Sequence, residues 1–146
     1  CYTVRSMPTT LVDRPRFVSY GDGEGDTAGV GICVFCKKTA LPVAAFAEVP
    51  DEICRLWSRR AGIGEYHDIV LVEAIAPLFV LFTYPQLLRG AAWVHCIGNA
   101  AAQHALLRGS SSIYSRDHIV GWTRDRVAGL DCWPYSDRVH TQLNPF

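Results

Sequence analysis

The chain has 146 residues, which is the size of one ordinary domain. Hydrophobic residues make up 49% of it and charged residues 19%, and with four Trp, six Tyr and six Phe this composition excludes disorder over most of the chain. The formal net charge is zero, so no field of the whole molecule attracts nucleic acid or a membrane. Any polyanionic partner must therefore be bound by a local basic patch.

The longest apolar run, from Ile69 to Phe82, contains Glu73 and Pro77 and is shorter than the roughly 20 residues that span a bilayer. We expect it to form a buried helix. No signal peptide is visible, because the N-terminus lacks a charged start followed by an apolar stretch. The chain begins without Met and stops at Phe146, from which we expect a domain excised from a longer protein.

The six cysteines could pair, but the apolar content is sufficient for folding without disulfides. We therefore expect free thiols in a reducing compartment and an intracellular location, in the nucleus or the cytoplasm. Cys33 and Cys36 resemble half of a zinc or redox motif, yet on a strand residues three apart point to opposite faces. No second such pair follows and the histidines lack metal-ligand spacing, so no zinc site is expected. Cys54, Cys96 and Cys132 are expected to be small core residues.

The first third of the chain predicts an N-terminal segment and then strands. Residues 1–15 contain two prolines and predict an extended segment that precedes the domain over 16–146. A glycine-rich acidic loop is expected over 21–26. Alternation and β-branched residues predict an antiparallel meander of strands over 16–20, 30–35 and 41–49.

Helices and strands alternate in the remainder. Pro77 is expected to kink the main helix because it removes a backbone hydrogen bond. Asn99 is a candidate N-cap, and Gly109 follows the last turn of the same helix. Ser110 to Ser112 are expected to cap the next helix. Helices are predicted over 50–62, from 65–68 to 90, over 99–108 and over 113–128, and strands over 91–97 and 138–142. This order predicts an α/β fold with a five-stranded mixed sheet flanked by helices.

Asp22 stands between two glycines at the end of the first predicted strand, where a ligand can approach the backbone closely. It is either a functional acid or part of a plain acidic turn. An EF-hand is excluded, because Thr27 stands where that loop needs Gly and Cys33 where it needs Glu. The glycines match neither a dinucleotide fingerprint nor a phosphate-binding loop, and no G-x-S-x-G elbow of a serine hydrolase is present.

Glu73 is the most unusual residue of the sequence. Apolar residues flank it on every helix face, and an unpaired carboxylate there would cost several kcal/mol. One interpretation is a core acid with a Lys or hydrogen-bonding partner. The other is a carboxylate beside a second acid and a metal ion.

Asp22, Glu73 and the stretch IGNAAAQHALLRGSS from Ile97 to Ser111 resemble the ribonuclease H domain of retroelement polyproteins, over roughly residues 16–146. In that family an Asp ends the first strand, a Glu lies in the first long helix, and an Asp-Asn pair precedes an alanine-rich helix. Asp22, Glu73 and Asn99 match these positions. The Leu-Arg-Gly-Ser-Ser match is typical of the tyrosine-recombinase type of retrotransposon. The C-terminal RVHTQLNPF resembles the family's last strand and Asn-Pro motif.

Two departures from the family concern its acids. The third acid aligns with Gly98, and the fourth would follow Phe146, outside the chain. The resemblance implies two Mg²⁺ or Mn²⁺ ions about 4 Å apart between the acids, of which only Asp22 and Glu73 are present as metal ligands. The domain is then naturally degenerate, or inactivated by substitution at Gly98, or stops before its tail.

The resemblance implies a ribonuclease H-like domain of a retroelement reverse transcriptase, which hydrolyses RNA in RNA–DNA hybrids by two-metal catalysis and is inactive or degenerate in this sequence. Asp22, Glu73 and Gly98, the position of the missing acid, are the catalytic positions. The partners are the hybrid and the reverse transcriptase part of the polyprotein, with no membrane. The first alternative is a catalytically dead domain that binds nucleic acid or has a structural role. The second is an unrelated α/β enzyme.

Substrate contacts are expected from a basic patch on the two helices that follow Gly98. Arginine–phosphate contacts give salt-dependent affinity. The plain alternative is a solvated helix face. The candidate residues are Asn99, Arg108, Arg116, Arg124 and Arg126, together with Trp122 as a stacking residue.

Overall fold

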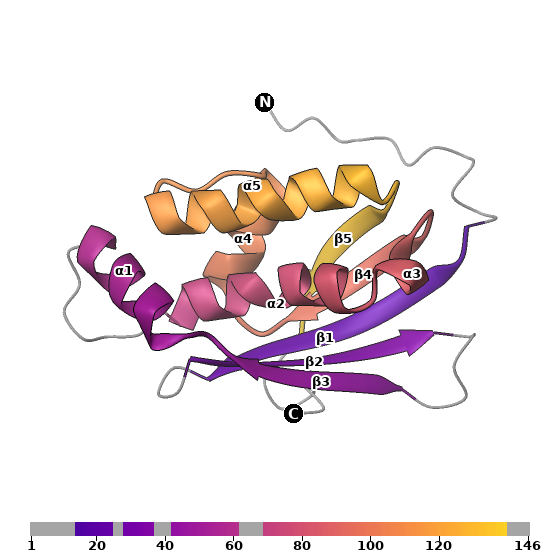
Figure 1. The fold of residues 1–146 in the computed structure, drawn as a ribbon. Coiled ribbons are helices and arrows are strands. Elements are labelled where there is room, and N and C mark those ends of the chain that lie inside the picture. The colour runs from indigo at the N-terminus through magenta and orange to yellow at the C-terminus, as the bar shows by residue number, and fades with distance from the viewer. Residues whose placement is uncertain (1–13, 25–27, 37–41, 62–68, 140–146) are drawn as a thin grey trace.

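The structure is a computed structural model and describes residues 14–24, 28–36, 42–61 and 69–139. Five strands form one mixed sheet in the order β3-β2-β1-β4-β5 (Figure 1). The first three strands pair antiparallel, whereas β4 lies parallel to β1 and β5 parallel to β4. The strands are β1 (Arg16–Glu24), β2 (Gly29–Cys36), β3 (Val43–Glu48), β4 (Ala92–Ile97) and β5 (Trp133–Arg138). The predicted α/β fold with a five-stranded mixed sheet is confirmed.

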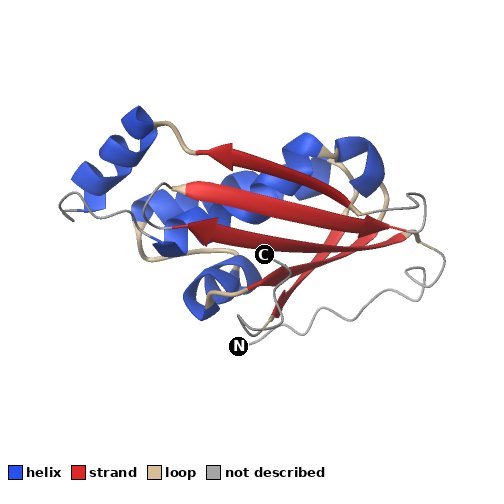
Figure 2. Ribbon diagram, turned by 90° about the horizontal axis from the view of Figure 1, so that it is seen from below, coloured by secondary structure: helices blue, strands red, loops and turns tan. Residues whose placement is uncertain are grey.

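The helices of the described residues lie on one side of this sheet (Figure 1), and Figure 2 shows the sheet from the other side with no helix in front of it. They are α1 (Asp51–Ala61), α2 (Ile69–Thr83), α3 (Pro85–Leu88), α4 (Ala100–Arg108) and α5 (Tyr114–Gly129). In the part of the chain that the structure describes, no helix is long and apolar enough to cross a membrane.

Helix α2 is the centre of the core and packs on β1 and β2 on one side and on α4 and α5 on the other. Its buried Val72, Ala76 and Val80 belong to the main apolar cluster, together with Phe17 and Trp93 of the sheet. Each large apolar side chain buried in this way contributes about 1.5–3 kcal/mol. The burial explains why α2 continues through its internal proline to Thr83, although proline removes a backbone hydrogen bond.

Several predicted boundaries are wrong. The acidic stretch after Tyr20 is not a loop from Gly21 onward, because β1 stays paired with β2 as far as Glu24. The last strand ends at Arg138 instead of beginning there, since Pro134 is tolerated on the edge strand β5. The predicted helix start over 65–68 and the strand residues 140–142 lie outside the described residues.

Capping contacts define both ends of α4 and the start of α5. Asn99 is the N-cap of α4, as predicted, and Gly109 follows its end with a φ of 74° in the left-handed region. The predicted serine cap of α5 is wrong, because Ile113 is the N-cap and makes no side-chain bond. Instead Ser111 accepts a hydrogen bond from the Ile113 N–H at 3.2 Å, and Asp117 accepts one from the Ser111 N–H at 2.9 Å.

The described cysteines are free thiols, as expected. Cys54, Cys96 and Cys132 are buried, in agreement with their predicted packing role. Cys33 and Cys36 lie on β2, and only Cys36 packs against the main apolar cluster under the helices. The two thiols therefore point to opposite faces of the sheet and do not form a chelating pair.

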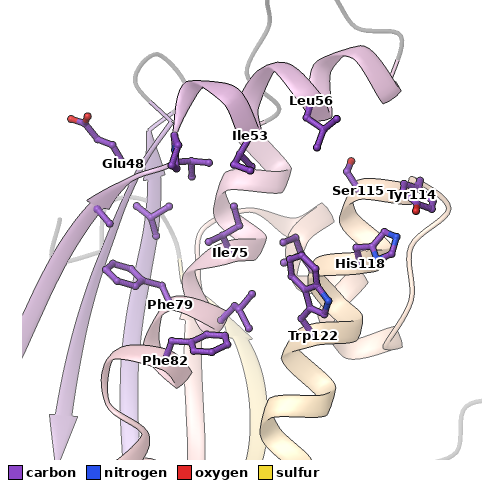
Figure 3. Close-up of a pocket in the computed structure, with 16 residues that line it drawn as sticks. Glu48, Ile53, Leu56, Ile75, Phe79, Phe82, Tyr114, Ser115, His118 and Trp122 are labelled. Carbon is purple, nitrogen blue, oxygen red and sulfur yellow. The ribbon is translucent and has the colours of Figure 1, made fainter.

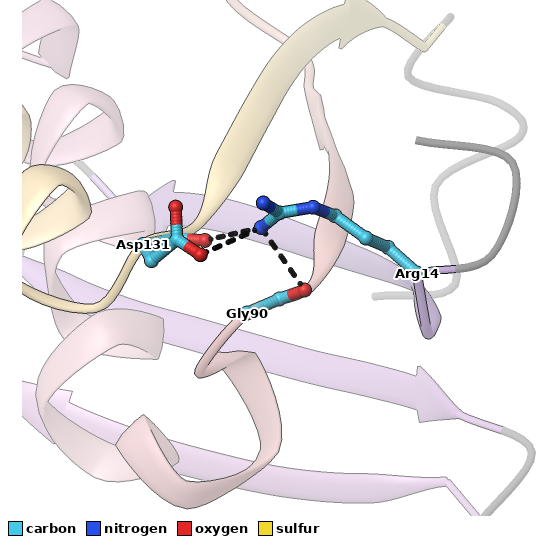
Figure 4. Close-up of polar contacts among 3 residues, drawn as sticks. All are labelled: Arg14, Gly90 and Asp131. Atoms are coloured by element: carbon cyan, nitrogen blue, oxygen red, sulfur yellow. Dashed lines mark hydrogen bonds and ion pairs between the residues drawn. The ribbon is translucent and has the colours of Figure 1, made fainter. Parts of the chain in front are cut away.

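An arginine joins the beginnings of three neighbouring strands (Figure 4). Arg14, which precedes β1, donates from Nη1 to the Gly90 carbonyl at 3.3 Å before β4. The same nitrogen donates to the carbonyl and to the carboxylate of Asp131, both at 2.9 Å, before β5. We call this the Arg14 clasp; it pairs polar groups of three chain segments at the end of the sheet where the parallel strands start.

Candidate active site

The predicted acids meet at the opposite end of the sheet, where β1 and β4 end. Asp22 lies near the end of β1, and Gly98 directly follows β4, whose Ile97 pairs in register with Gly21. Glu73 comes from the second turn of α2, which packs on β1. The structure therefore brings together the three positions assigned to catalysis.

Two glycines allow α2 to approach β1 closely. A Cβ at Gly21 would overlap the side chain of Ala76 and would lie 2.9 Å from His95 Cε1. A Cβ at Gly23 would lie 3.0 Å from the backbone nitrogen of Glu73. Larger residues at either position would push the helix away, so the Gly-Asp-Gly sequence sets how closely Glu73 meets the sheet.

Glu73 is buried, with only 6% of its surface exposed. The backbone of Gly98 donates a hydrogen bond to its carboxylate, whereas Oε2 is buried without a hydrogen-bond partner. Burial, and then the charge of Asp22, raise the pKa of Glu73 to about 7 against the opposing effect of the Gly98 hydrogen bond. At neutral pH the carboxyl group is therefore divided between its protonated and charged forms.

Asp22 is less buried than Glu73. Its partial burial raises its pKa, and a hydrogen bond from the backbone of Gly23 works in the opposite direction. The two carboxyl groups are close enough for the charge of Asp22 to act on Glu73. A pair of acids that repel each other at a sheet end is typical of a site that binds a cation or exchanges protons.

Gly98 has open space where a side chain would stand. A Cβ there would have one neighbour within 4 Å, the Glu73 Oε1 atom at 3.5 Å, which is ordinary van der Waals contact. Its φ lies outside the left-handed region, so the backbone does not require glycine. A Cβ at position 98 would therefore fit beside Glu73 without moving the backbone.

The carboxylates fit one divalent cation but not two. Their oxygens are the ligands that hard cations prefer, and Glu73 Oε2 has no competing hydrogen bond. Among the described residues, however, no three His, Cys, Asp or Glu side chains gather where they could hold a metal. Two cations would have to share Asp22 and Glu73, which leaves each with too few protein ligands.

Asn99, expected to contact substrate, has a structural role in the free chain. Its Oδ1 accepts hydrogen bonds from the backbone N–H groups of Ala101 at 2.9 Å and Ala102 at 3.1 Å. These bonds pair two of the free N–H groups in the first turn of α4. Asn99 thereby fixes the start of α4 directly beside Gly98.

The predicted arginines do not share one face. Arg124 donates to the Gly109 carbonyl at 3.1 Å, which places it beside Arg108 at the turn between α4 and α5. The Arg126 guanidinium instead lies 4.9 Å from the centre of the Phe82 ring on α2. Arg116 is half-buried near the start of α5. Arg108 and Arg124 are the two members that the Gly109 contact brings to the same turn.

His95 is a buried polar residue that the sequence did not predict. His95 on β4 is 1% exposed, its Nδ1 lies 2.8 Å from Ser19 Oγ, and Trp93 Nε1 donates to the same hydroxyl at 2.7 Å. Burial lowers the pKa of His95 to about 3, and its Nε2 has no hydrogen-bond partner. Strand alternation, which places His95 on the helix-facing side of β4 with Trp93, was the signal available in the sequence.

No protein-family model and no curated protein matches this sequence. Solved structures do match. RNase H1 from the halophilic archaeon Halobacterium salinarum has a TM-score of 0.66 and 12% identity, over 88% of this chain and 89% of that chain. The chain has a ribonuclease H-like fold.

Two further solved structures are similar to this chain. LC11-RNase H1, solved in complex with an RNA/DNA hybrid, has a TM-score of 0.62 and 9% identity over 88% of each chain. The N-terminal RNase H domain of rv2228c from Mycobacterium tuberculosis has a TM-score of 0.62 and 9% identity over 89% of this chain and 86% of that chain. Identities this low establish the ribonuclease H-like fold and leave the chemistry to be argued from the site.

Proposed function

We propose that this ribonuclease H-like domain binds RNA–DNA hybrids and carries a reduced form of a hydrolytic site. The observation that supports the proposal best is the pair of close carboxyl groups, Asp22 and Glu73, beside the vacant side-chain position at Gly98. A similar fold, LC11-RNase H1, was solved with an RNA/DNA hybrid bound. Hydrolysis by this chain is slow or absent, because the sequence supplies only Asp22 and Glu73 of the four acids that the resemblance implies.

Asp22 and Glu73 are the residues that would hold a divalent cation, Mg²⁺ or Mn²⁺. The cation would polarise an RNA phosphate and lower the pKa of a bound water. In the free chain Glu73 is held in place by the backbone hydrogen bond from Gly98, and Oε2 is left as its unpaired atom. Because its pKa is about 7, Glu73 must lose a proton at neutral pH before it can bind a cation fully.

The retroelement context is part of the same proposal. It is supported by the Leu-Arg-Gly-Ser-Ser sequence, which covers the last two residues of α4 and the start of the turn to α5. In this turn Gly109 takes the left-handed conformation and accepts the hydrogen bond from Arg124. The expected partner within the polyprotein is the reverse transcriptase, and the arginine pair at this turn, Arg108 and Arg124, is the proposed contact to hybrid phosphates.

A catalytically dead binding domain is the second candidate. Gly98 favours it, because a Cβ at this position would have room and the residue carries no acid. In that case the same surface binds hybrid, and the acids only retain a cation. Both candidates bind RNA–DNA hybrid, and only the first hydrolyses it.

The test measures hybrid binding by fluorescence anisotropy and hybrid cleavage with Mg²⁺. Gly98→Asp is expected to cleave hybrid faster than the unchanged chain, and Gly98→Ala, the matched control that adds Cβ without a charge, is expected not to. Glu73→Gln should abolish any cleavage. Binding of hybrid without cleavage by all variants would replace the hydrolase with the binding domain, and absence of hybrid binding would reject both.

A further inference from the structure

His95 belongs to a short chain of buried polar side chains on the helix-facing side of the sheet. Trp93 Nε1 donates to Ser19 Oγ at 2.7 Å, and Ser19 Oγ lies 2.8 Å from His95 Nδ1. The centres of the Trp93 and His95 rings lie 5.4 Å apart, and Ser19 is the residue of β1 that pairs in register with His95. The hydrogen bond and the ring contact hold the imidazole in one orientation, so β1 and β4 together fix its position.

The far edge of this ring lies where α2 packs on β1. A Cβ at Gly21 would lie 2.9 Å from His95 Cε1 and 3.1 Å from its Nε2, and it would overlap the side chain of Ala76. The ring edge, the backbone of Gly21 and the side chain of Ala76 therefore meet around one point. Because protein interiors are close-packed, the bulk of the ring limits how closely α2 can approach β1 at Ala76.

This contact is next to both acids of the candidate site. Gly21 directly precedes Asp22 on β1. Ala76 follows Glu73 by three residues, which places the two side chains on the same side of α2. The Gly98 backbone donates a hydrogen bond to the Glu73 carboxylate. A shift of α2 at Ala76 would therefore change the position of Glu73 relative to Asp22 and Gly98.

We propose that His95 is a positioning residue for the acid pair. Its ring sets the spacing between α2 and β1 and thereby holds Glu73 beside Asp22 and the Gly98 backbone. This role rests on the proposed function, because the acid pair is the proposed cation site. A histidine that only stabilised the fold would act through its hydrogen bond to Ser19, whereas a spacer acts through the bulk of its ring.

Another side of α2 provides a control. Ile75, Phe79 and Phe82 line a cavity of about 560 Å³ together with residues of α1, α5 and the neighbouring ends of β2 and β3 (Figure 3). Neither Ala76 nor His95 is among the described residues that line it. A substitution of Phe79 therefore changes the packing of α2 on the cavity side and leaves the His95 ring in place.

The test compares two variants of His95 by NMR without cations and by calorimetric titration with Mg²⁺, both at pH 8. His95→Asn keeps a group that can bond Ser19 but lacks the ring edge, whereas His95→Phe keeps a ring but cannot make that hydrogen bond. In His95→Asn the Gly98 amide proton should lose its hydrogen-bonded chemical shift and exchange faster with solvent. Mg²⁺ should bind this variant about tenfold more weakly. His95→Phe should resemble the unchanged chain in both measurements, although urea unfolding shows it to be less stable.

Phe79→Leu is the matched control and should leave the Gly98 amide and the Mg²⁺ affinity unchanged. The Ala101 amide, which donates to Asn99 Oδ1 at 2.9 Å, is the internal reference for a general loosening of the fold. Circular dichroism verifies folding, and His95→Leu, which also lacks the ring, replaces His95→Asn if that variant is unfolded.

The proposal is overturned if His95→Phe loses the Gly98 signal and His95→Asn retains it, because His95 would then act through its hydrogen bond alone. Equal behaviour of the two variants, or the same loss in Phe79→Leu, overturns it as well. If the unchanged chain binds no Mg²⁺, the proposed cation site fails. The amide comparison contains no cation, so it still decides whether the His95 ring positions Glu73.

Discussion

The two ends of the sheet differ in whether their polar groups have hydrogen-bond partners. Where β1, β4 and β5 begin, the Arg14 clasp gives one guanidinium nitrogen three oxygen partners from Gly90 and Asp131. Where β1 and β4 end, Glu73 is buried beside Asp22, and its Oε2 has no partner. Both ends are built from the same strands, so the difference lies in the residues placed there and not in the fold.

The comparison supports the proposal that the functional site lies at the end of the sheet that carries the acids. A chain selected for stability alone would pair its buried polar atoms, and most proteins do so. In the described residues, three buried side-chain polar atoms lack a hydrogen-bond partner, and Glu73 Oε2 and His95 Nε2 are two of them. A Cβ at Gly21, next to Asp22, would lie 3.1 Å from that same His95 nitrogen. The unpaired groups thus concentrate toward the end of the sheet that carries the acids.

The largest expected effect concerns His95. Its pKa is lowered from 6.5 to about 3, so below pH 6.5 the unfolded chain binds a proton that the folded chain does not. Stability should therefore fall as the pH decreases through this window, by on the order of 5 kcal/mol at its acid limit. Urea unfolding from neutral to acid pH measures the dependence.

His95→Leu should remove this component and flatten the acid side of the stability curve. His118→Leu is the matched control, because it makes the same substitution at a histidine that is exposed instead of buried. Equal slopes for the unchanged chain and His95→Leu would show that His95 is protonated in the folded state, contrary to its burial.

Glu73 should produce the opposite dependence with a smaller amplitude. Its pKa is raised from 4.5 to about 7, so the folded chain keeps a proton that the unfolded chain loses in this range. Its contribution to stability is complete below pH 4.5 and falls as the pH rises to 7, by about 3 kcal/mol. Glu73→Gln should be more stable than the unchanged chain above pH 7 and should lose this slope.

Added Mg²⁺ tests whether Glu73 belongs to a cation-binding site or is only a buried acid of the core. If Asp22 and Glu73 bind the cation, Mg²⁺ should stabilise the unchanged chain above pH 7 and leave Glu73→Gln unaffected. The comparison of the two sheet ends fails if Glu73→Gln destabilises the chain at pH 8, because Glu73 Oε2 would then have a partner.

The sequence predicted the order of the elements better than their ends. Alternation placed β2 and β4 nearly correctly, and the side-chain chemistry of Asn99 and Gly109 located both ends of α4. The last strand was misplaced because Pro134 argues against a strand unless the strand is known to be at the edge. Edge position follows from the sheet order, which local sequence does not contain.

The candidate site could be predicted only through single residues. Glu73 stood out because a carboxylate in an apolar helix needs an explanation, and Asp22 because glycines flank it. That Gly21 and Gly23 serve the approach of α2 depends on the packing of residues more than fifty positions apart, such as Gly21 and Ala76. His95 and the cavity beside α5 were missed for the same reason, since both arise from contacts between distant elements.

Breaking the Arg14 clasp should have a moderate effect. Arg14→Ala leaves Asp131 without its cation, and because Asp131 is 69% exposed the loss should be about 1–2 kcal/mol, or a fall in Tm of about 3–6 °C. Asp131→Asn suits the φ of 50° at this position and removes only the charge. In a double-mutant cycle the stability losses of Arg14→Ala and Asp131→Asn should not add. Additive losses would show that Arg14 and Asp131 do not stabilise the chain through their mutual contact.

Asn99 gives the smallest effect and tests the acid end directly, since it follows Gly98 and its Oδ1 accepts two hydrogen bonds. Asn99→Ala should lower stability by about 1 kcal/mol through loss of the N-cap of α4. Asn99→Ser retains a capping oxygen and should recover most of that stability, so any remaining loss of hybrid affinity in Asn99→Ser reports contact with substrate. Full affinity in Asn99→Ser would assign Asn99 to the fold alone, and unchanged stability in Asn99→Ala would contradict its role as a cap.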